Sequence, residues 1–205
     1  QNGVRRFIFA SSSAVYGDCE TMPLSESSRG ELQSPYAKSK FEIEQKIDDC
    51  FQQGSEFLSL RFFNVYGPRQ RFDSKYGAVV PIFIDGLTSG DQPKIYGSGA
   101  QSRDFVHVRD VARLLVDLSI GEWAQPKQSV YNVGTGQSVT IFELASLIHE
   151  LSQSKLPFEP SFHTQRAGDI EHSVASIEAI KRDLNWKPEI SLEDGLRELI
   201  EVDSS

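Results

Sequence analysis

Two short apolar runs, separated by one helical segment, set the strongest limit on how this chain can fold. The first run covers residues 7–10 and the second covers residues 57–63. Between them, residues 34–53 have helical spacing, begin with a serine and a proline, and are followed by Gly54. Strand, helix and strand in this order predict a parallel β-α-β unit. We therefore expect an α/β fold with a doubly wound parallel sheet, whose ligands bind at the carboxyl ends of the strands.

The rest of the chain mixes helices and strands in a different pattern. Helices are expected over residues 79–87, 111–118, 140–151, 177–184 and 192–202, and strands over residues 94–96, 103–108 and 129–133. Glycine and proline interrupt this half repeatedly. We expect residues 1–67 to belong to a sheet domain and residues 68–205 to form mainly a smaller mixed α/β lobe, with about 104–135 returning to the sheet domain.

A glycine-rich phosphate-binding turn does not open a first helix in this sequence. The nearest candidate, Gly134-Thr135-Gly136, follows an expected strand and precedes an expected helix, but it lies in the second half and has no third glycine. A tight turn between strand and helix explains it better. Parallel sheets rarely stop at two strands. We therefore expect the chain to begin within a dinucleotide-binding domain.

Charge and cysteine content narrow the classes of partner. The 205 residues carry a net charge of −8 and no basic cluster, which argues against nucleic acid and anionic membranes. No apolar stretch approaches the ~18 residues of a membrane span. Cys19 and Cys50 are isolated and are expected to be reduced thiols of a cytoplasmic protein. The four histidines have no metal-ligand spacing, so no metal site is predicted, and His107 is expected to be structural.

Tyr36 and Lys40 are the strongest candidates for chemistry. They lie four apart in the expected helix, so both side chains share one face. A cation beside a phenol favours the phenolate, which makes the pair a candidate general acid/base for an alcohol. A tyrosine and a lysine four apart are also common by chance, usually as a solvated pair or a helix–helix contact.

Several motifs in a fixed order give the pair a context. They are residues 9–17 (FASSSAVYG), 34–40 (SPYAKSK), 60–70 (LRFFNVYGPRQ), 102–112 (SRDFVHVRDVA), 131–134 (YNVG) and 166–169 (RAGD). With them the chain resembles the extended short-chain dehydrogenases/reductases of the NAD-dependent epimerase/dehydratase family, and within these the C-terminal two-thirds of UDP-hexose 4-epimerases. The resemblance implies an NAD(P)-binding Rossmann-type sheet with a smaller lobe for the nucleotide sugar.

The resemblance also implies roles for individual residues. Tyr36 matches the catalytic base, Lys40 the lysine that holds the nicotinamide ribose and favours the tyrosinate, and Ser12 the hydroxyl that bonds the reacting oxygen. Cofactor contacts are expected from Tyr36, Lys40, Phe63 and Ser11, and substrate contacts from Ser13, Asn64, Val79, Arg103, Arg166, Asp169 and Ser173. Among the latter, the arginines and Asn64 would hold the diphosphate and Asp169 a ribose hydroxyl. Taken alone, Arg103 equally fits a surface ion pair, and Ser12 better fits a turn.

The residues after Ser12 favour one reaction within the family. Relatives that eliminate water carry an acidic pair there, and relatives that decarboxylate carry a glutamate, whereas this chain has Ser13 and Ala14. The resemblance then implies 4-epimerisation of a UDP-hexose by transient oxidation at C4 with bound NAD. Ser173 would leave room for an N-acetyl group at C2, which implies UDP-N-acetylglucosamine as well as UDP-glucose, or UDP-uronic acids.

Two alternative functions stay open. The chain could serve another NAD-dependent sugar-nucleotide reaction, as a uronate epimerase, dehydratase or reductase. It could bind a UDP-sugar without turning it over, as a truncated chain. The resemblance also implies a homodimer through a helix bundle that includes residues 34–53, although the apolar side chains of that helix could equally pack within the chain.

Overall fold

A parallel sheet is the centre of the computed structural model, which describes residues 4, 6–54, 56–70, 78–121, 126–165 and 169–203. Within these residues the sheet has the strand order β1 (Arg6–Ser12), β2 (Glu56–Phe62) and β7 (Val130–Val133), all parallel. Helix α1 (Pro35–Gln52) connects β1 to β2. The predicted β-α-β unit is confirmed.

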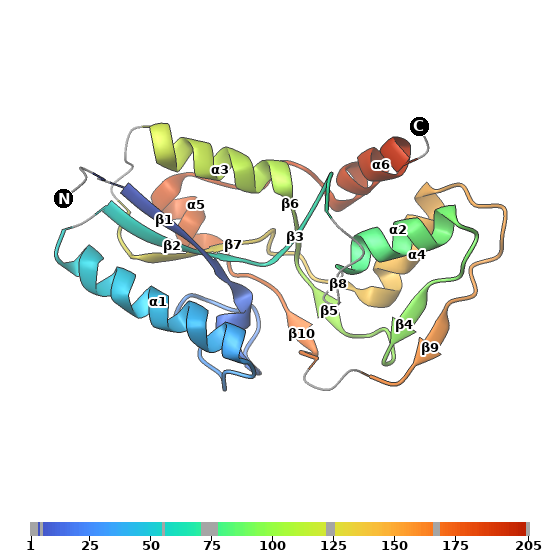
Figure 1. The fold of residues 1–205 in the computed structure, drawn as a ribbon, viewed down its shortest axis with the longest axis horizontal. Coiled ribbons are helices and arrows are strands. Elements are labelled where there is room, and N and C mark those ends of the chain that lie inside the picture. The colour runs from blue at the N-terminus through green and yellow to red at the C-terminus, as the bar shows by residue number, and fades with distance from the viewer. Residues whose placement is uncertain are drawn as a thin grey trace.

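Helices cover both faces of this sheet (Figure 1). α1 lies on one face, and α3 (Val108–Ile120) and α5 (Glu178–Leu184) lie on the other. Strands β2 and β7 are largely buried because each face is covered, as expected of a parallel sheet, and Ser59, Arg61 and Asn132 are among the polar residues buried in them. The buried apolar side chains between the layers form the first core, which includes Leu58, Leu60, Val111, Leu114, Tyr131, Val133, Ile180 and Trp186.

Local sequence explains where α1 begins and ends. The Ser34 hydroxyl accepts a hydrogen bond from the backbone N–H of Ala37, and Pro35 occupies the first turn. Gly54 follows the helix with a φ of +87°, a left-handed backbone that glycine adopts without strain. The helix therefore starts and stops where its capping residues predict.

A second group of elements packs beside the sheet. It contains three helices, α2 (Val79–Thr88), α4 (Ile141–Leu151) and α6 (Leu192–Asp203), and two small sheets, one of β4 (Lys94–Tyr96) with β9 (Ser161–His163), the other of β10 (His172–Ser173), β5 (Ser102–Arg103) and β8 (Val139–Thr140). Their buried apolar side chains form the second core, which includes Tyr66, Val80, Phe83, Ile95, Phe105, Leu144, Ile148 and Leu196.

The strand expected over residues 103–108 is in fact two strands that belong to different sheets. β5 ends at Arg103, and β6 (Phe105–His107) pairs with β3 (Asn64–Tyr66). Asp104 separates them because its buried carboxylate takes hydrogen bonds from outside either sheet. Val108 begins α3 instead of ending a strand, with the His107 ring as the cap of that helix. His107 is buried, as its predicted structural role requires.

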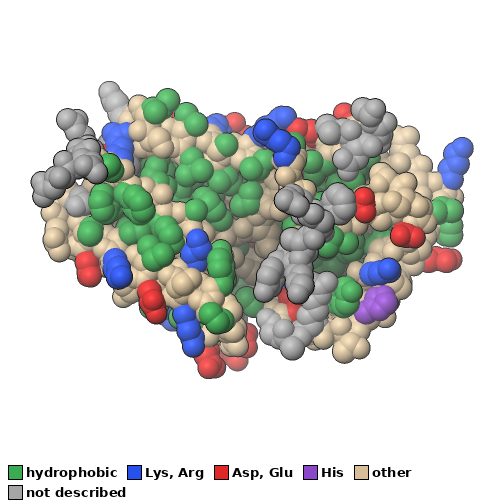
Figure 2. Space-filling view, viewed as in Figure 1, with side chains coloured by type: hydrophobic (Ala, Val, Ile, Leu, Met, Phe, Trp, Pro, Cys, Tyr) green, Lys and Arg blue, Asp and Glu red, His purple; other side chains and the backbone are tan. Residues whose placement is uncertain are grey.

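The described sheet has an open edge at β1, since no described strand pairs with its outer side. Phe7 lies on this strand with an exposed ring, and apolar side chains gather over this part of the molecule (Figure 2). Cys19 and Cys50 are both free. None of the helices in the described ranges has the length and apolar character needed to cross a membrane.

Candidate active site

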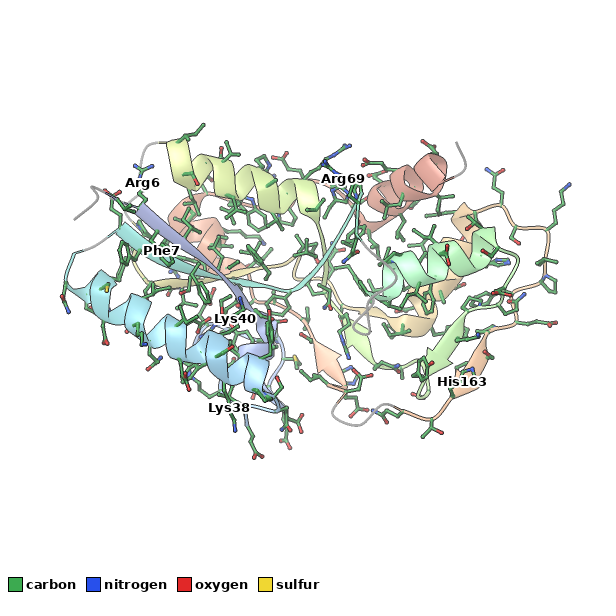
Figure 3. The ribbon with its side chains drawn as sticks, in the orientation of Figure 1. Arg6, Phe7, Lys38, Lys40, Arg69 and His163 are labelled. Atoms are coloured by element: carbon green, nitrogen blue, oxygen red, sulfur yellow. The ribbon has the colours of Figure 1, made fainter. Side chains whose placement is uncertain are left out.

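Lys40 lies beside the carboxyl end of β1 (Figure 3), and its ammonium lies over the ring of Tyr36. The Lys40 Nζ donates a hydrogen bond of 2.8 Å to the backbone carbonyl of Ala10. The same ammonium lies 4.8 Å from the ring centroid of Phe9 and 5.5 Å from the ring centroid of Tyr36. One turn of α1 therefore places a phenol and a cation in the same space, at the end of the sheet where parallel folds bind ligands.

Both groups of this pair can reach a ligand. The Tyr36 side chain is 55% exposed at the first turn of α1. An ammonium has three donors, and among the described residues Ala10 is its one hydrogen-bond acceptor. Two donors of Lys40 are therefore available to hydroxyl or phosphate oxygens of a bound molecule.

Three consecutive serines at the end of β1 have different surroundings. The Ser12 hydroxyl caps the short 3-10 helix η1 (Ser13–Tyr16) and accepts from the backbone N–H of Ala14 at 3.2 Å. Since this bond uses only a lone pair, the hydroxyl proton of Ser12 can still be donated. Ser13 is half-buried in η1. The Ser11 hydroxyl is buried and donates to the carboxylate of Glu44.

The Glu44 carboxylate belongs to a buried ion pair that joins α1 to the sheet. The Arg61 Nη2 lies 2.7 Å from Glu44 Oε2, and both side chains are almost fully excluded from solvent. The guanidinium also lies 4.7 Å from the ring centroid of Tyr16, whose hydroxyl donates to Asn132. Burial raises the pKa of Tyr16 to about 12, so its phenol stays neutral at ordinary pH. This network holds the strand end next to Lys40 in place.

This network was not predicted from the sequence, although the sequence contains two indications of it. Arg61 is a charge inside an otherwise apolar strand, which predicts a buried partner. Glu44 follows Lys40 by four residues, so it lies on the same face of α1.

A separate cavity of about 500 Å³ lies next to the second core. It is lined by four of the predicted substrate residues, Asn64, Val79, Arg103 and Asp169. The other lining residues include Lys94, Tyr96, Gln101 and Phe83. A cavity of this size, with cations and amides on an apolar wall, suits a small polar molecule.

Arg103 and Asp169 form an ion pair in the wall of this cavity. The Arg103 Nη2 lies 2.5 Å from Asp169 Oδ1, and its Nη1 donates to the carbonyl of Ser102 at 2.9 Å. Burial lowers the pKa of Arg103, and the carboxylate of Asp169 opposes this effect. A guanidinium remains charged in proteins, so an anion with two oxygens can compete with Asp169 for it.

The remaining predicted residues have other surroundings. The Phe63 ring is buried in the first core, with its centroid 6.2 Å from that of Tyr16. Ser173 is 6% exposed in β10, where strand register places it opposite Arg103. Arg166 lies outside the described residues. The structure thus brings Ser12, Ser13, Tyr36 and Lys40 to the end of β1, and Asn64, Val79, Arg103 and Asp169 to the cavity, whereas Phe63 and Ser173 belong to neither group.

The turn at Gly134-Thr135-Gly136 is committed to a partner inside the protein. The backbone N–H groups of Thr135 and Gly136 donate to the carboxylate of Asp104 at 2.7 Å and 2.9 Å. These are the groups that a phosphate-binding loop would offer to its ligand. The turn is therefore structural, in keeping with the sequence interpretation.

Comparison with known proteins gives this arrangement a family. A model of the NAD dependent epimerase/dehydratase family matches residues 1–134. The chain belongs to this family. The resemblance inferred from the motifs is confirmed.

Individual members of the NAD dependent epimerase/dehydratase family cover the chain almost completely. The UDP-glucose 4-epimerase of Mycolicibacterium smegmatis is 34% identical over 203 residues, which are 97% of this chain and 62% of that protein. The structure of a UDP-N-acetylglucosamine 4-epimerase from Methanobrevibacter ruminantium in complex with UDP-N-acetylmuramic acid matches with a TM-score of 0.89 and 36% identity, covering 100% of this chain and 65% of that one. MoeE5 in complex with UDP-glucose and NAD matches with a TM-score of 0.82 and 33% identity, covering 98% and 66%. The chain thus spans less than two thirds of the length of these relatives.

Proposed function

We propose that this chain carries the acid/base and nucleotide-sugar residues of an NAD-dependent UDP-hexose 4-epimerase. The observation that supports this most is the position of Tyr36 and Lys40 at the carboxyl end of β1. The cavity lined by Asn64, Arg103 and Asp169 supplies a place for the nucleotide part of the substrate. Relatives that are similar over nearly the whole chain are named as 4-epimerases of UDP-sugars.

Tyr36 is the proposed proton acceptor for the sugar 4-hydroxyl. Its side chain is 55% exposed, and the Lys40 ammonium lies 5.5 Å from the centroid of its ring, so a bound sugar could reach both groups. Ser12 keeps a hydroxyl proton that it can donate to the same sugar oxygen. The three side chains together hold the oxygen in place and move its proton on and off.

The residues at this position also fit a nicotinamide dinucleotide. Two ammonium donors of Lys40 are available for ribose hydroxyls beside Tyr36. NAD bound there would accept hydride from C4 of the sugar and return it, so the cofactor ends as it began. Phe63 and Ser11, which were expected to contact the cofactor, are buried in the protein. We propose that they support this site through packing and hydrogen bonding in the interior.

Arg103, Asn64 and Asp169 are the proposed contacts to UDP. A guanidinium pairs with phosphate through two parallel hydrogen bonds, and the Asn64 amide can add a donor. Asp169, released from Arg103, can accept from a ribose hydroxyl. Val79 provides an apolar part of the cavity wall. Arg166, which lies outside the described residues, is proposed as a further contact to the diphosphate.

The short helix η1 favours epimerisation over the other reactions of the family. A dehydratase or a decarboxylase needs a second acid/base next to the reacting carbon. The residues that follow Ser12 in η1 are Ser13 and Ala14, and neither side chain titrates near neutral pH. Epimerisation needs one acid/base, Tyr36, for the proton of the 4-hydroxyl, whereas the hydrogen on C4 would leave as hydride to NAD and return to the opposite face of the sugar.

Turnover of UDP-glucose to UDP-galactose, with NAD supplied, tests this proposal. We expect Tyr36→Phe to lower the rate by about 10²–10⁴-fold, the usual contribution of a general acid/base. The affinity for UDP should stay within about twofold, since the phenol lies outside the nucleotide cavity. Ser39→Ala is the matched control, because Ser39 lies in the same turn of α1 and, within the described part of the chain, its hydroxyl donates to the backbone carbonyl of Tyr36.

A second candidate function is binding of UDP-sugar without turnover. The Tyr36 side chain is 55% exposed and lies outside the cavity lined by Asn64, Arg103 and Asp169, so UDP could bind in that cavity without a reaction at Tyr36. A chain that binds UDP but shows no change of product with NAD or NADH supports this alternative. Net reduction or loss of water from the UDP-sugar points to another reaction of the family.

A further inference from the structure

Asp104 carries a buried carboxylate that the proposed chemistry does not use. It lies between β5 and β6 and is fully buried. Within the described part of the chain it has no ion-pair partner, and its oxygens accept from Thr135 N, Thr135 Oγ1, Gly136 N and Ala175 N at 2.6–3.1 Å. Burial raises the pKa of Asp104, and these hydrogen bonds oppose the rise. A carboxylate buried without a cation is costly, so its surroundings must be built to keep it.

The backbone around Asp104 is built for this contact. A Cβ at Gly134 would lie 2.7 Å from the Asp104 Oδ2 and 2.8 Å from the Cβ of Ala175, closer than atoms can approach. Only glycine therefore lets the turn after β7 close over the carboxylate. The side chain of Asp104 thereby ties together the turn after β7 and the segment after β10.

The same residue fixes two groups that line the cavity. The carbonyl of Asp104 accepts from the backbone N–H of Asn64 at 2.9 Å and from the Asn64 Nδ2 at 3.3 Å. Arg103 precedes Asp104 in the chain, so the position of the Asp104 backbone also fixes the backbone from which the Arg103 side chain extends. The carboxylate anchors this stretch of backbone in the interior, while Asn64 and Arg103 line the cavity.

We propose that Asp104 is a positioning residue for recognition of the diphosphate, which holds the Asn64 amide and the Arg103 guanidinium at a fixed separation. The inference rests on the proposed function insofar as the cavity binds the UDP part of the substrate. It does not depend on which reaction follows.

Titration calorimetry of the 205-residue chain with UDP and with uridine tests this inference. Uridine lacks both phosphates, so it reports on the cavity without the groups that Asp104 positions. We expect Asp104→Asn to weaken UDP binding at least about tenfold, which is about 1.4 kcal/mol, and to leave uridine binding within about twofold. Thr135→Val removes a single hydrogen bond to the carboxylate and should give a smaller loss in the same direction, which keeps the test decisive if Asp104→Asn does not fold.

Asp110→Asn is the matched control. Asp110 is also a buried carboxylate that holds backbone N–H groups, those of Glu189 and Ile190, but it does not line the cavity. We expect this variant to lose thermal stability and to keep its affinity for UDP. Equal loss of UDP affinity in the Asp104 and Asp110 variants, or equal loss for UDP and uridine, overturns the inference. An Asp104→Asn variant that binds UDP with the affinity of the unsubstituted chain overturns it too.

The outcomes separate this inference from the proposed function. If the unsubstituted chain binds UDP and Asp104→Asn does not, but no epimerase activity is found, the positioning role stands and the reaction is wrong. If activity is found and Asp104→Asn binds UDP normally, the reaction stands and the positioning role is wrong. If the unsubstituted chain does not bind UDP, both are wrong.

Discussion

Ser11 and Ser12 show how one step along a strand changes what a side chain can do. Successive residues of a strand point to opposite faces of the sheet. The Ser11 hydroxyl therefore meets Glu44 in the interior, whereas Ser12 reaches the end of the strand and keeps a donor for a ligand. The sequence motif contains both serines, and only the structure separates their surroundings.

Tyr16 leads to a prediction about alkaline pH. Burial raises its pKa to about 12, while an unfolded tyrosine titrates near ~10. Between these values the unfolded chain loses the phenol proton and the folded chain keeps it. The stability is therefore complete below about pH 10 and is lost as the pH rises toward about 12, by up to about 3 kcal/mol.

Urea unfolding between about pH 8 and pH 11 checks this dependence. Tyr16→Phe should cost about 1 kcal/mol at the lower pH, since the hydrogen bond to Asn132 is lost, and should show a shallower decline above pH ~10. Some decline should remain, because burial also raises the pKa of Tyr131 to about 12. An identical decline in Tyr16→Phe and the unsubstituted protein contradicts the assignment.

Ser173 leads to a prediction about substrate size. It lies opposite Arg103 in strand register and carries a small side chain. If it faces the C2 substituent of the sugar, Ser173→Tyr should lower turnover of UDP-N-acetylglucosamine at least about tenfold and leave turnover of UDP-glucose within about threefold. The measurement is the ratio of kcat/KM for the two sugars. Equal loss for both sugars, or no loss for either, counts against this position.

At the scale of the element, α1 carries the groups proposed for catalysis and a structural carboxylate on one face. Tyr36, Lys40 and Glu44 are spaced four apart, so they follow one another along the helix. Glu44 binds Arg61 of β2 and Ser11 of β1, and Lys40 binds Ala10 of β1. The helix is therefore fixed against both strands next to the residues that carry the proposed chemistry.

The ion pair of Glu44 and Arg61 leads to a prediction about stability. Removing one partner leaves the other charge buried, so Glu44→Ala or Arg61→Ala should each lower the free energy of unfolding by about 3–5 kcal/mol. The double variant Glu44→Leu/Arg61→Met should be more stable than either, because no buried charge remains. Urea unfolding of the three variants measures this, and additive losses in the double variant would contradict it.

The long elements could be predicted from the sequence, and the short strands could not. The apolar runs and the capping residues of α1 define the β-α-β unit without reference to the rest of the chain. Strands β8 and β10 have two residues each, too few for a period of alternation to show. Asp104 breaks the strand expected over residues 103–108 through contacts with residues 31 to 71 positions away in sequence, which no local pattern can contain.

At the scale of the whole molecule, the candidate site depends on both cores. Tyr36 and Lys40 lie on α1, which packs on the sheet that the first core supports, and the cavity proposed for the nucleotide lies against the second core. Residues 60–70 cross from one to the other, with Phe63 in the first core and Tyr66 in the second. The motif residue between them, Asn64, therefore lies at the crossing.

The family resemblance leads to a prediction about assembly. A dimer through α1 needs apolar contact on the face of this helix that does not touch the sheet, where Ile43 is 38% exposed. Light scattering should give twice the mass of one chain, and Ile43→Glu should reduce it to that of a monomer. The control is Ile120→Glu, which should leave the dimer intact. Ile120 is more exposed than Ile43 and belongs to α3, on the opposite face of the sheet. A monomer before substitution contradicts the prediction.

Both cores are completed late in the chain, which bears on how the protein is made. Trp186 is buried in the first core and Leu196 in the second, although their partners reach back to Tyr16 and Tyr66. During synthesis, the segments around Tyr16 and Tyr66 therefore keep apolar surface uncovered until the segments that carry Trp186 and Leu196 have left the ribosome. A nascent chain that ends before Trp186 should therefore bind holding chaperones more strongly than one that extends past Leu196.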